Sequence, residues 1–323
     1  MPFPLFRLPF VALSEVMKTF EVRQLFPLSL CSKRMHQVVK NLRDKSVELK
    51  LELRTDGYEN RFSLSVKNTP NTLLNLSVLP VRENQTGWRV DEYPEAVFQK
   101  VYSGFKSYWA DVEDGTRCLM KLIRDLFSVN VDLVVADRNL WVLDMVEEIQ
   151  GPRSYNAHCD IQRSDEQFRH LLVDLNPTSL NLYNRPSEQF RIENFRKTYD
   201  TLDVWHGNWI SGDNLLTLDC ATLSMFDATF RVAEINRFFR HVLIEEGTPR
   251  LTEFRAQVEN IDENGILDGI REVLAPIPGR VQFEDNNRFW KFSGTLARGD
   301  QLMFVSIRCE KDRRRGIRLE IGE

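Results

Sequence analysis

The sequence has few of the residues that build disulfide frameworks, zinc sites or membrane spans. Its 323 residues include only five cysteines, which are widely spaced and never form a C-x-x-C pair. An odd, scattered set of this kind is typical of reduced core thiols rather than of disulfides or metal ligands. No stretch approaches the roughly 18 uncharged apolar residues that cross a membrane. We therefore expect a protein of the cytosol, the nucleus or both, without a membrane partner.

The sequence also lacks an excess of basic charge and the motifs of common enzymes. Lys and Arg number 43 against 47 Asp and Glu, for a net charge of −4, whereas a nucleic-acid partner requires a basic face. There is no phosphate-binding loop, no paired-glycine nucleotide fingerprint and no HExxH motif. We therefore predict no nucleic-acid partner, no cofactor, no metal and no catalytic residue.

One triplet, His158-Cys159-Asp160, places a base, a thiol and an acid side by side. Neighbouring residues of a strand point to opposite faces, so these three side chains do not converge on one point. A core strand is the better interpretation. An enzyme with an unrecognised site remains an alternative, and a deep pocket with converging polar groups would favour it.

The first forty residues show helical periodicity. Apolar residues recur at the spacing of one helical stripe, first over residues 10–20 and again over residues 28–40. We expect two or three short amphipathic helices, with Pro9 in the first turn. A unit of this size is at the limit of independent stability. It therefore either presents an apolar face to a partner or packs on the rest of the chain.

Residues 4–44 resemble an F-box of the nematode variety. The resemblance lies in Phe6-Arg7-Leu8-Pro9, in Leu25 and in the run from Leu28 to Arg34. The F-box family docks on the Skp adaptor, which links it to a cullin scaffold and so to ubiquitin transfer. Carried over by position, the residues that form or border the adaptor-docking surface are Leu8, Pro9, Val16, Phe20, Leu25, Leu28, Cys31, Ser32, Lys33 and Arg34.

Two positions depart from the F-box pattern. Glu21-Val22 stands where the family often has Asp-Pro, and Pro27 lies further in. A proline inside a helix removes a backbone hydrogen bond and costs about 3 kcal/mol. The helix is therefore expected either to kink at Pro27 or to restart with Pro27 in its first turn. A degenerate F-box that no longer docks, in a plain interaction scaffold, remains an alternative.

Behind these helices the pattern changes to strands and then to alternating helices and strands. Residues 45–110 predict a β-rich connecting segment, with strands at 47–53, 61–66 and 74–79. Residues 111–260 predict an α/β repeat region, and residues 261–323 a C-terminal β-hairpin cap. Within the repeat region, apolar helix faces are expected over residues 119–126, 168–175 and 235–243, the second opened by Ser164 and Gln167 and the third closed by Gly247.

Three short segments of this region share the pattern hydroxyl, Leu, polar, aliphatic, aromatic. They are residues 179–183, 201–205 and 222–226, and weaker copies occur at 131–135, 157–161 and 251–256. Their spacing falls in the range of leucine-rich repeats, which predicts parallel strands stacked into an α/β solenoid. The asparagine ladder of standard repeats is absent. The predicted fold is thus α+β or α/β: a small helical F-box followed by an irregular leucine-rich-repeat-like domain with flanking strands.

Residues 200–260 also resemble the F-box-associated domain, type 2, that follows the F-box in nematode proteins. The resemblance lies in Trp209-Ile210 and in residues 215–220, 235–240 and 247–251. In that family the associated domain is taken to choose substrates. The resemblance therefore implies a role and no particular ligand.

The alternation of the three strands predicts what lies on the open face of the sheet. If the leucines face the helices, then Tyr183, Trp205 and Phe226 face the other way, about 4.8 Å apart from strand to strand. They would form an aromatic ladder, with Asp203 on the same face. Aromatic side chains are common in binding hot spots, so these four residues are the candidate substrate site. The alternative is that the aromatic rings turn under a loop and extend the core.

Together these patterns predict a non-catalytic substrate-recognition subunit of a Skp–cullin–F-box ubiquitin ligase. The expected partners are a Skp-family adaptor, a cullin through it, and a protein substrate that the sequence does not identify. Substrate recognition is expected either on the repeat face or on the C-terminal hairpins.

Overall fold

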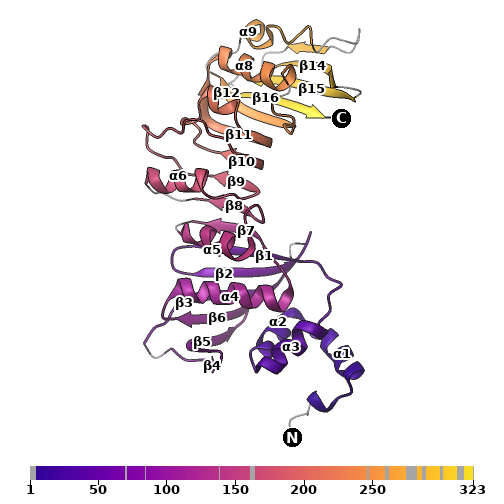
Figure 1. Cartoon of the computed structure of the whole chain (residues 1–323), viewed down its shortest axis with the longest axis vertical. Helices are drawn as coiled ribbons and strands as arrows, with labels where there is room; N and C mark the ends of the chain where they lie inside the picture. The colour runs from indigo at the N-terminus through magenta and orange to yellow at the C-terminus, as the bar shows by residue number, and fades with distance from the viewer. Residues whose placement is uncertain are drawn as a thin grey trace. The chain divides into compact units, whose positions relative to one another are not determined.

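The structure is a computed structural model that describes residues 5–69, 71–83, 85–137, 139–160, 164–245, 247–258, 262–273, 282–285, 289–298, 301–310 and 316–322. The chain divides into two compact units, residues 1–156 and residues 157–323 (Figure 1). The division falls inside the range 111–260 that the sequence pattern assigned to one repeat region. Within the described residues, no helix has the length and apolar character to cross a membrane.

The first unit begins with three short helices, as the periodicity predicts. They are α1 (Phe10–Lys18), α2 (Val22–Ser29) and α3 (Lys33–Leu42), after a 3₁₀ turn at Leu5–Arg7. Pro9 is the N-cap of α1, one position before its first turn. The Ser32 hydroxyl accepts a hydrogen bond from the Met35 N–H at 3.1 Å and starts α3. The apolar stripe over residues 28–40 is therefore divided between two helices rather than carried by one.

Pro27 lies inside α2, which begins five residues earlier at Val22. The expected restart of the helix at Pro27 is therefore wrong. The reason is local: Glu21 and Gln24 form a capping box that starts the helix upstream, with the Glu21 N–H donating to Gln24 Oε1 at 2.9 Å. Because Pro27 is close to the C-terminal end, it removes one backbone bond without interrupting the helix.

A mixed sheet follows in the first unit. Its strands are β1 (Leu49–Thr55), β2 (Asn60–Val66), β3 (Thr72–Pro80), β4 (Trp88–Val90), β5 (Tyr93–Val101), β6 (Gly104–Trp109) and β7 (Val131–Ala136), in the order β7-β1-β2-β3-β6-β5-β4. β1 and β7 are parallel, as are β3 and β6, and the other pairs are antiparallel. The three predicted strands of residues 45–80 are present, each shifted by one or two residues.

Two helices cover this sheet. They are α4 (Val112–Phe127), which lies against β2, β3 and β6, and α5 (Trp141–Gln150), which lies against β7 (Figure 1). The predicted apolar face of α4 is buried, with Leu119, Ile123 and Leu126 no more than 1% exposed. At its start, Gly115 lies against the Trp109 indole, where a Cβ would approach ring atoms to 2.4 Å. The glycine thus permits the close packing of α4 on the sheet.

The second unit is built on parallel strands closed by antiparallel ones. Its strands run in the order β13-β14-β15-β16-β12-β11-β10-β9-β8. Their bounds are β8 (Asn156–Cys159), β9 (Ser179–Leu182), β10 (Thr198–Val204), β11 (Asp219–Phe230), β12 (Glu253–Val258), β13 (Gln282–Asp285), β14 (Phe289–Arg298), β15 (Gln301–Glu310) and β16 (Gly316–Gly322). β9 to β12 are parallel, and β13 to β16 form the predicted hairpins, with β16 antiparallel to β12.

The register of the parallel strands is the one that the repeat pattern predicts. Leu180, Leu202 and Leu223 are directly aligned across β9, β10 and β11, and Phe254 of β12 continues the row. All four side chains are no more than 1% exposed. Aligned apolar rows of this kind define a solenoid core, so the leucine-rich-repeat-like prediction is confirmed for this part of the chain.

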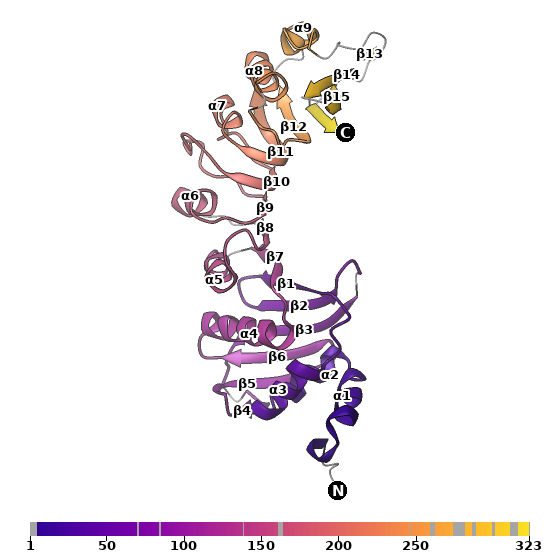
Figure 2. The same ribbon diagram turned by 45° about the vertical axis from the view of Figure 1, so that its right-hand side comes forward.

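Helices of the second unit cover the leucine side of the strands. They are α6 (Asp165–Val173), α7 (Gly212–Leu215), α8 (Val232–Leu243) and α9 (Glu263–Leu267), of which α6, α7 and α8 lie on one side in Figure 2. Trp209 is the centre of this packing, with its ring centroid 5.7–5.8 Å from those of Phe168, Phe190 and Phe195. The opposite face of the strands carries the polar and aromatic side chains of the repeats.

The end of α8 differs from its prediction. The helix ends at Leu243, four residues before Gly247, which the pattern gave as its closing glycine. The Gly247 N–H still donates to the His241 carbonyl at 3.0 Å, and a Cβ at Gly247 would approach the His241 ring to 1.9 Å. The glycine is therefore required by close packing on the last turn rather than as the cap itself.

Candidate functional site

Within the first unit, a buried arginine attaches the N-terminal helices to α4. Arg43, which follows α3, is 7% exposed. Its Nε donates to the Leu126 carbonyl at 3.0 Å and its Nη2 to the Phe127 carbonyl at 2.5 Å. These carbonyls belong to the last turn of α4, where no helical N–H can reach them, and the helix dipole favours a cation there. Burial lowers the pKa of Arg43, but a guanidinium stays charged at neutral pH.

Two further contacts support this attachment. Asp125 on α4 accepts hydrogen bonds from Lys40 Nζ and, at 2.7 Å, from His36 Nε2, both on α3. These two bonds, that of Lys40 first, hold the pKa of Asp125 below its ordinary value. On α2, the Phe26 ring lies 5.5 Å from that of Phe105 on β6. The three helices are thus held on α4 and the sheet by charge pairing, hydrogen bonds and ring packing.

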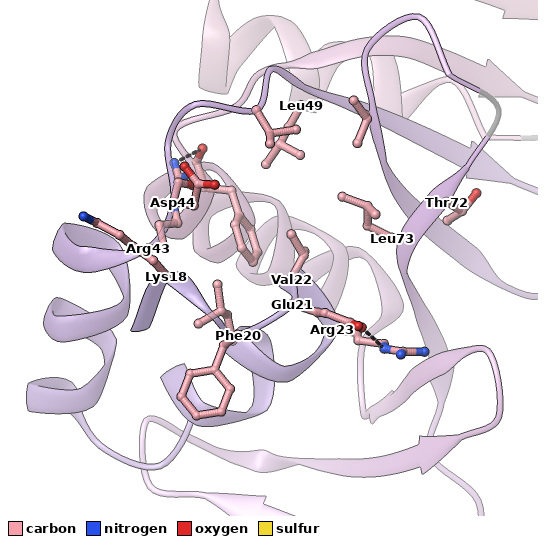
Figure 3. A pocket seen from close by; sticks show the side chains of 14 residues that line it. Lys18, Phe20, Glu21, Val22, Arg23, Arg43, Asp44, Leu49, Thr72 and Leu73 are labelled. Atoms are coloured by element: carbon pink, nitrogen blue, oxygen red, sulfur yellow. Dashed lines mark hydrogen bonds and ion pairs between the residues drawn. The ribbon is translucent and has the colours of Figure 1, made fainter. Parts of the chain in front are cut away.

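The helices do not fill the space against the sheet. A pocket of about 480 Å³ lies between them. Its lining includes Phe20 and Val22 from the N-terminal segment and Leu73 from β3 (Figure 3). A second cavity of about 860 Å³ is lined by Phe20, Leu28 and Tyr102, among others. Three of the predicted docking residues, Phe20, Leu25 and Leu28, therefore line hollows between the helices and their own sheet.

The ten predicted docking residues differ in their access to solvent. Exposed are Pro9, Cys31, Ser32, Lys33 and Arg34; half-buried are Leu8, Val16, Phe20 and Leu28. Leu25 is only 3% exposed, so it belongs to the core of the helical unit rather than to its surface. Phe10, on the predicted apolar stripe of α1, and Val11, off that stripe, are each 72% exposed. The sequence analysis gave neither as a docking residue, and their adjacency as two apolar residues was the signal that could have singled them out.

The aromatic ladder of the second unit is present as predicted. The ring centroids of Tyr183 and Trp205 are 5.6 Å apart, and those of Trp205 and Phe226 are 5.2 Å apart. Tyr183 is 39% and Trp205 45% exposed, so neither turns under a loop, while Phe226 is half-buried. His158 extends the ladder at 6.5 Å from Tyr183. His158 lies in the weak repeat copy at residues 157–161, and that repeat was the feature of the sequence that could have predicted its place in the ladder.

A polar row runs beside the ladder. Asn181, Asp203 and Ser224 are aligned across β9, β10 and β11, and Arg255 follows on β12. The Asp203 Oδ1 is buried and has no hydrogen-bond partner within the part of the chain that the structure describes. Desolvation raises the pKa of Asp203, and the positive charge of Arg255 opposes this only in part. The polar row therefore contains one carboxylate, that of Asp203, whose negative charge is only partly balanced by a nearby positive charge.

Two cysteines of the second unit are buried thiols. Cys159 is fully buried, while the neighbouring His158 reaches the aromatic ladder, so the two face opposite sides as strand alternation predicts. Burial raises the pKa of Cys220 to about 12, which keeps it a thiol. No group of three or more His, Cys, Asp or Glu side chains in the described part of the chain could hold a metal ion.

Comparison with known families decides the interpretation of both regions. A family model described as F-box domain matches residues 5–46, and a model described as F-box associated matches residues 190–256. The chain combines an F-box with an F-box-associated domain. No curated protein and no solved structure matches the chain.

The two matches contain most of the surfaces described above. The F-box includes α1, α2, α3 and Arg43. The F-box-associated match includes Asp203, Trp205 and Phe226, whereas Tyr183 precedes it. F-box domains bind the Skp adaptor, and proteins of these two families are typically non-catalytic substrate adaptors.

Replacing Arg43 by alanine should loosen the F-box from α4. The substitution leaves buried carbonyls without a donor, and each costs about 1–3 kcal/mol. We expect faster amide hydrogen exchange over residues 10–42 and a free energy of unfolding lower by about 2–4 kcal/mol. Arg23→Ala is the control, because the Arg23 side chain is 67% exposed and its pair with Glu21 contributes little. Equal exchange in the two variants would contradict the attachment.

Replacing Asp203 by asparagine should stabilise the folded chain at pH 7. The raised pKa means that the folded state penalises the ionised carboxyl, and the neutral amide escapes this penalty. We expect a melting temperature higher by about 1–2 °C, corresponding to about 0.5 kcal/mol. The difference from wild type should shrink as the pH falls through the folded pKa, because the native carboxyl then becomes neutral. Asp213→Asn, whose side chain is 80% exposed, should show no such gain; a lower melting temperature for Asp203→Asn would contradict the argument.

Proposed function

We propose that the chain is the substrate-recognition subunit of a Skp–cullin–F-box ubiquitin ligase that acts in the cytosol or nucleus. The observation that carries the proposal is the presence of an F-box and an F-box-associated domain in one chain, in that order. In this function the chain catalyses no bond change. It raises the effective concentration of substrate lysines near the ubiquitin donor by binding the adaptor and the substrate at once.

The surface of the F-box supports adaptor docking. The Leu8-Pro9 corner and the run from Cys31 to Arg34 are accessible, and Phe10 and Val11 add apolar area. Exposed apolar residues on a small helical unit favour a helix-packing partner. Arg43 and Asp125 hold this unit on the first sheet, so a docked adaptor has a defined position relative to that sheet.

The open face of the F-box-associated region supports substrate binding. Tyr183 and Trp205 are large exposed side chains that directly follow β9 and β10. Their backbone N–H groups donate to the Cys159 and Leu182 carbonyls at 3.0 and 2.9 Å, which holds both residues on the edge of the sheet. Side chains held on a rigid scaffold lose little conformational entropy on binding, which is why aromatic residues dominate interface hot spots. The aromatic ladder and the polar row beside it together offer stacking, hydrogen-bonding and charged groups to a protein partner.

A non-ligase scaffold with a degenerate F-box is the second candidate. Two observations favour it: Pro27 lies within α2, and Phe20 and Leu28 line cavities against their own sheet. In this reading the F-box helices stabilise the first unit and bind no adaptor. Adaptor binding by the purified chain separates the two functions.

The wild-type chain should bind purified Skp adaptor, and Leu8→Asp should weaken the binding at least about tenfold, which is 1.4 kcal/mol. A charge at a half-buried apolar contact loses its hydration when the partner docks. Cys31→Asp, at an exposed position, should act in the same direction. Tyr58→Asp is the matched control, because Tyr58 is 78% exposed on the β1–β2 turn. Titration calorimetry measures all four proteins, and absent binding by the wild type would favour the scaffold.

Trp205→Ala should reduce substrate capture while leaving adaptor affinity unchanged. The side chain is 45% exposed, so its removal costs little core packing. Proximity labelling in cells with the ligase blocked compares the labelled proteins of the variant with those of wild type. Tyr102→Ala, at a fully exposed residue of the first unit, is the control. An unchanged set of labelled proteins with Trp205→Ala would remove the ladder from the substrate site.

A further inference from the structure

The centre of the ladder combines exposed aromatic rings with a carboxylate. Asp203 lies near the end of β10 and Trp205 directly follows that strand, with the buried Leu202 and Val204 alternating with them on the core side. The same alternation places the side chains of Asp203 and Trp205 on the open face. Trp205 is flanked by Tyr183 and Phe226, with ring planes tilted by 38° and 35°. Both neighbours of Asp203 in the register, Asn181 and Ser224, are uncharged.

The nearest basic side chain in the polar row is already engaged. Arg255 donates to Glu253 through Nε at 2.6 Å and through Nη2 at 2.5 Å. Glu253 is also bound by Arg318 at 2.8 Å, which in turn contacts Glu320 at 2.6 Å. The charges of this network compensate one another. Arg255 therefore offsets only part of the desolvation that raises the pKa of Asp203.

Charges at the other edge of the ladder are compensated as well. Asp227, which follows Phe226, contacts His206 at 2.7 Å and Arg185 at 3.8 Å. Neither of these basic side chains is paired with Asp203. The carboxylate of Asp203 is thus the one charge at the centre of this face whose buried oxygen has no partner among the described residues.

A buried carboxylate oxygen without a partner is costly, and such groups in folded proteins call for a physical explanation. A ligand that supplies the missing cation would remove the cost on binding. An apolar ligand would stack on the rings but would bury the charge further. Charge complementarity therefore selects a positively charged occupant.

We propose that Tyr183, Trp205 and Asp203 form a subsite for an arginine side chain of the protein substrate. The proposal rests on the proposed function, in which the open face of the repeats binds substrate. A guanidinium is planar, stacks on aromatic rings and makes charge-assisted hydrogen bonds to a carboxylate. It is also more weakly hydrated than an ammonium, which favours arginine over lysine in a half-buried site.

The test uses three short peptides that differ only in the central side chain: acetyl-Gly-Arg-Gly-amide, the lysine equivalent and the citrulline equivalent. Citrulline keeps the planar shape of arginine without its charge. Each peptide is titrated into the full chain labelled with ¹⁵N-tryptophan, and the indole N–H signal of Trp205, assigned with Trp205→Phe, reports binding. We expect a dissociation constant for the arginine peptide of about 1 mM, as for one side chain. The lysine peptide should bind several-fold more weakly, and the citrulline peptide should not bind measurably.

The same titration with Asp203→Asn should weaken arginine binding at least fivefold, although this variant is expected to be the more stable protein. Asp213→Asn removes an equal charge on the helix side and should leave the affinity unchanged. Loss of binding in a folded, stabilised variant distinguishes a ligand contact from a structural role.

Three results would overturn the inference: equal binding of citrulline and arginine, binding of lysine as tight as arginine, or an affinity that does not depend on Asp203. None of these three results depends on whether the chain binds the Skp adaptor. If Trp205→Ala loses substrate capture while the arginine peptide fails to bind, the subsite is wrong and the proposed function stands. If the chain binds the arginine peptide but not the adaptor, the subsite stands and the ligase function is wrong.

Discussion

The burial of one aligned leucine row decides what the repeats present to solvent. Leu180, Leu202 and Leu223 pair directly across β9, β10 and β11 and are no more than 1% exposed. Because strand side chains alternate, a shift of one residue would exchange the buried and exposed sets completely. The large free energy of burying leucine therefore fixes the position of Trp205 and its neighbours. The aromatic face is a consequence of the core, and it needs no stabilising contact of its own.

The first unit depends on a different constraint, the unsatisfied carbonyls at the end of α4. Every helix leaves its last carbonyls without internal donors, and a neighbouring arginine is one way to satisfy them. Here that donor is Arg43, at the end of the F-box, so the same hydrogen bonds that finish α4 also attach the F-box. A small helical unit that would be marginal alone thereby gains stability from the sheet behind it. The attachment leaves the Leu8-Pro9 corner and the Cys31–Arg34 run accessible.

Periodicity and spacing predicted the elements whose core faces are regular, and missed features that depend on a partner element. The strands of the repeats, their register and the apolar face of α4 follow from residue spacing alone. The end of α8 was misplaced because Gly247 is required by the His241 ring, a contact that no local pattern reveals. Likewise, Leu25 resembles its neighbours in sequence but is buried by them. The aromatic ladder was predictable because it repeats; the lack of a partner for Asp203 was not, since it depends on Arg255 being held by Glu253.

The aromatic ladder extends beyond the residues that the F-box-associated family model matches. The F-box-associated match begins at residue 190, so it includes Asp203, Trp205 and Phe226 but not Tyr183 or His158. The ring contacts nevertheless continue across that boundary, at 5.6 Å from Trp205 to Tyr183 and 6.5 Å from Tyr183 to His158. Continuity of this kind follows from stacking one strand on the next, since each repeat places the same position on the same face. The length of the aromatic face is therefore set by the number of stacked strands, while the charge at its centre is that of the single Asp203 carboxylate.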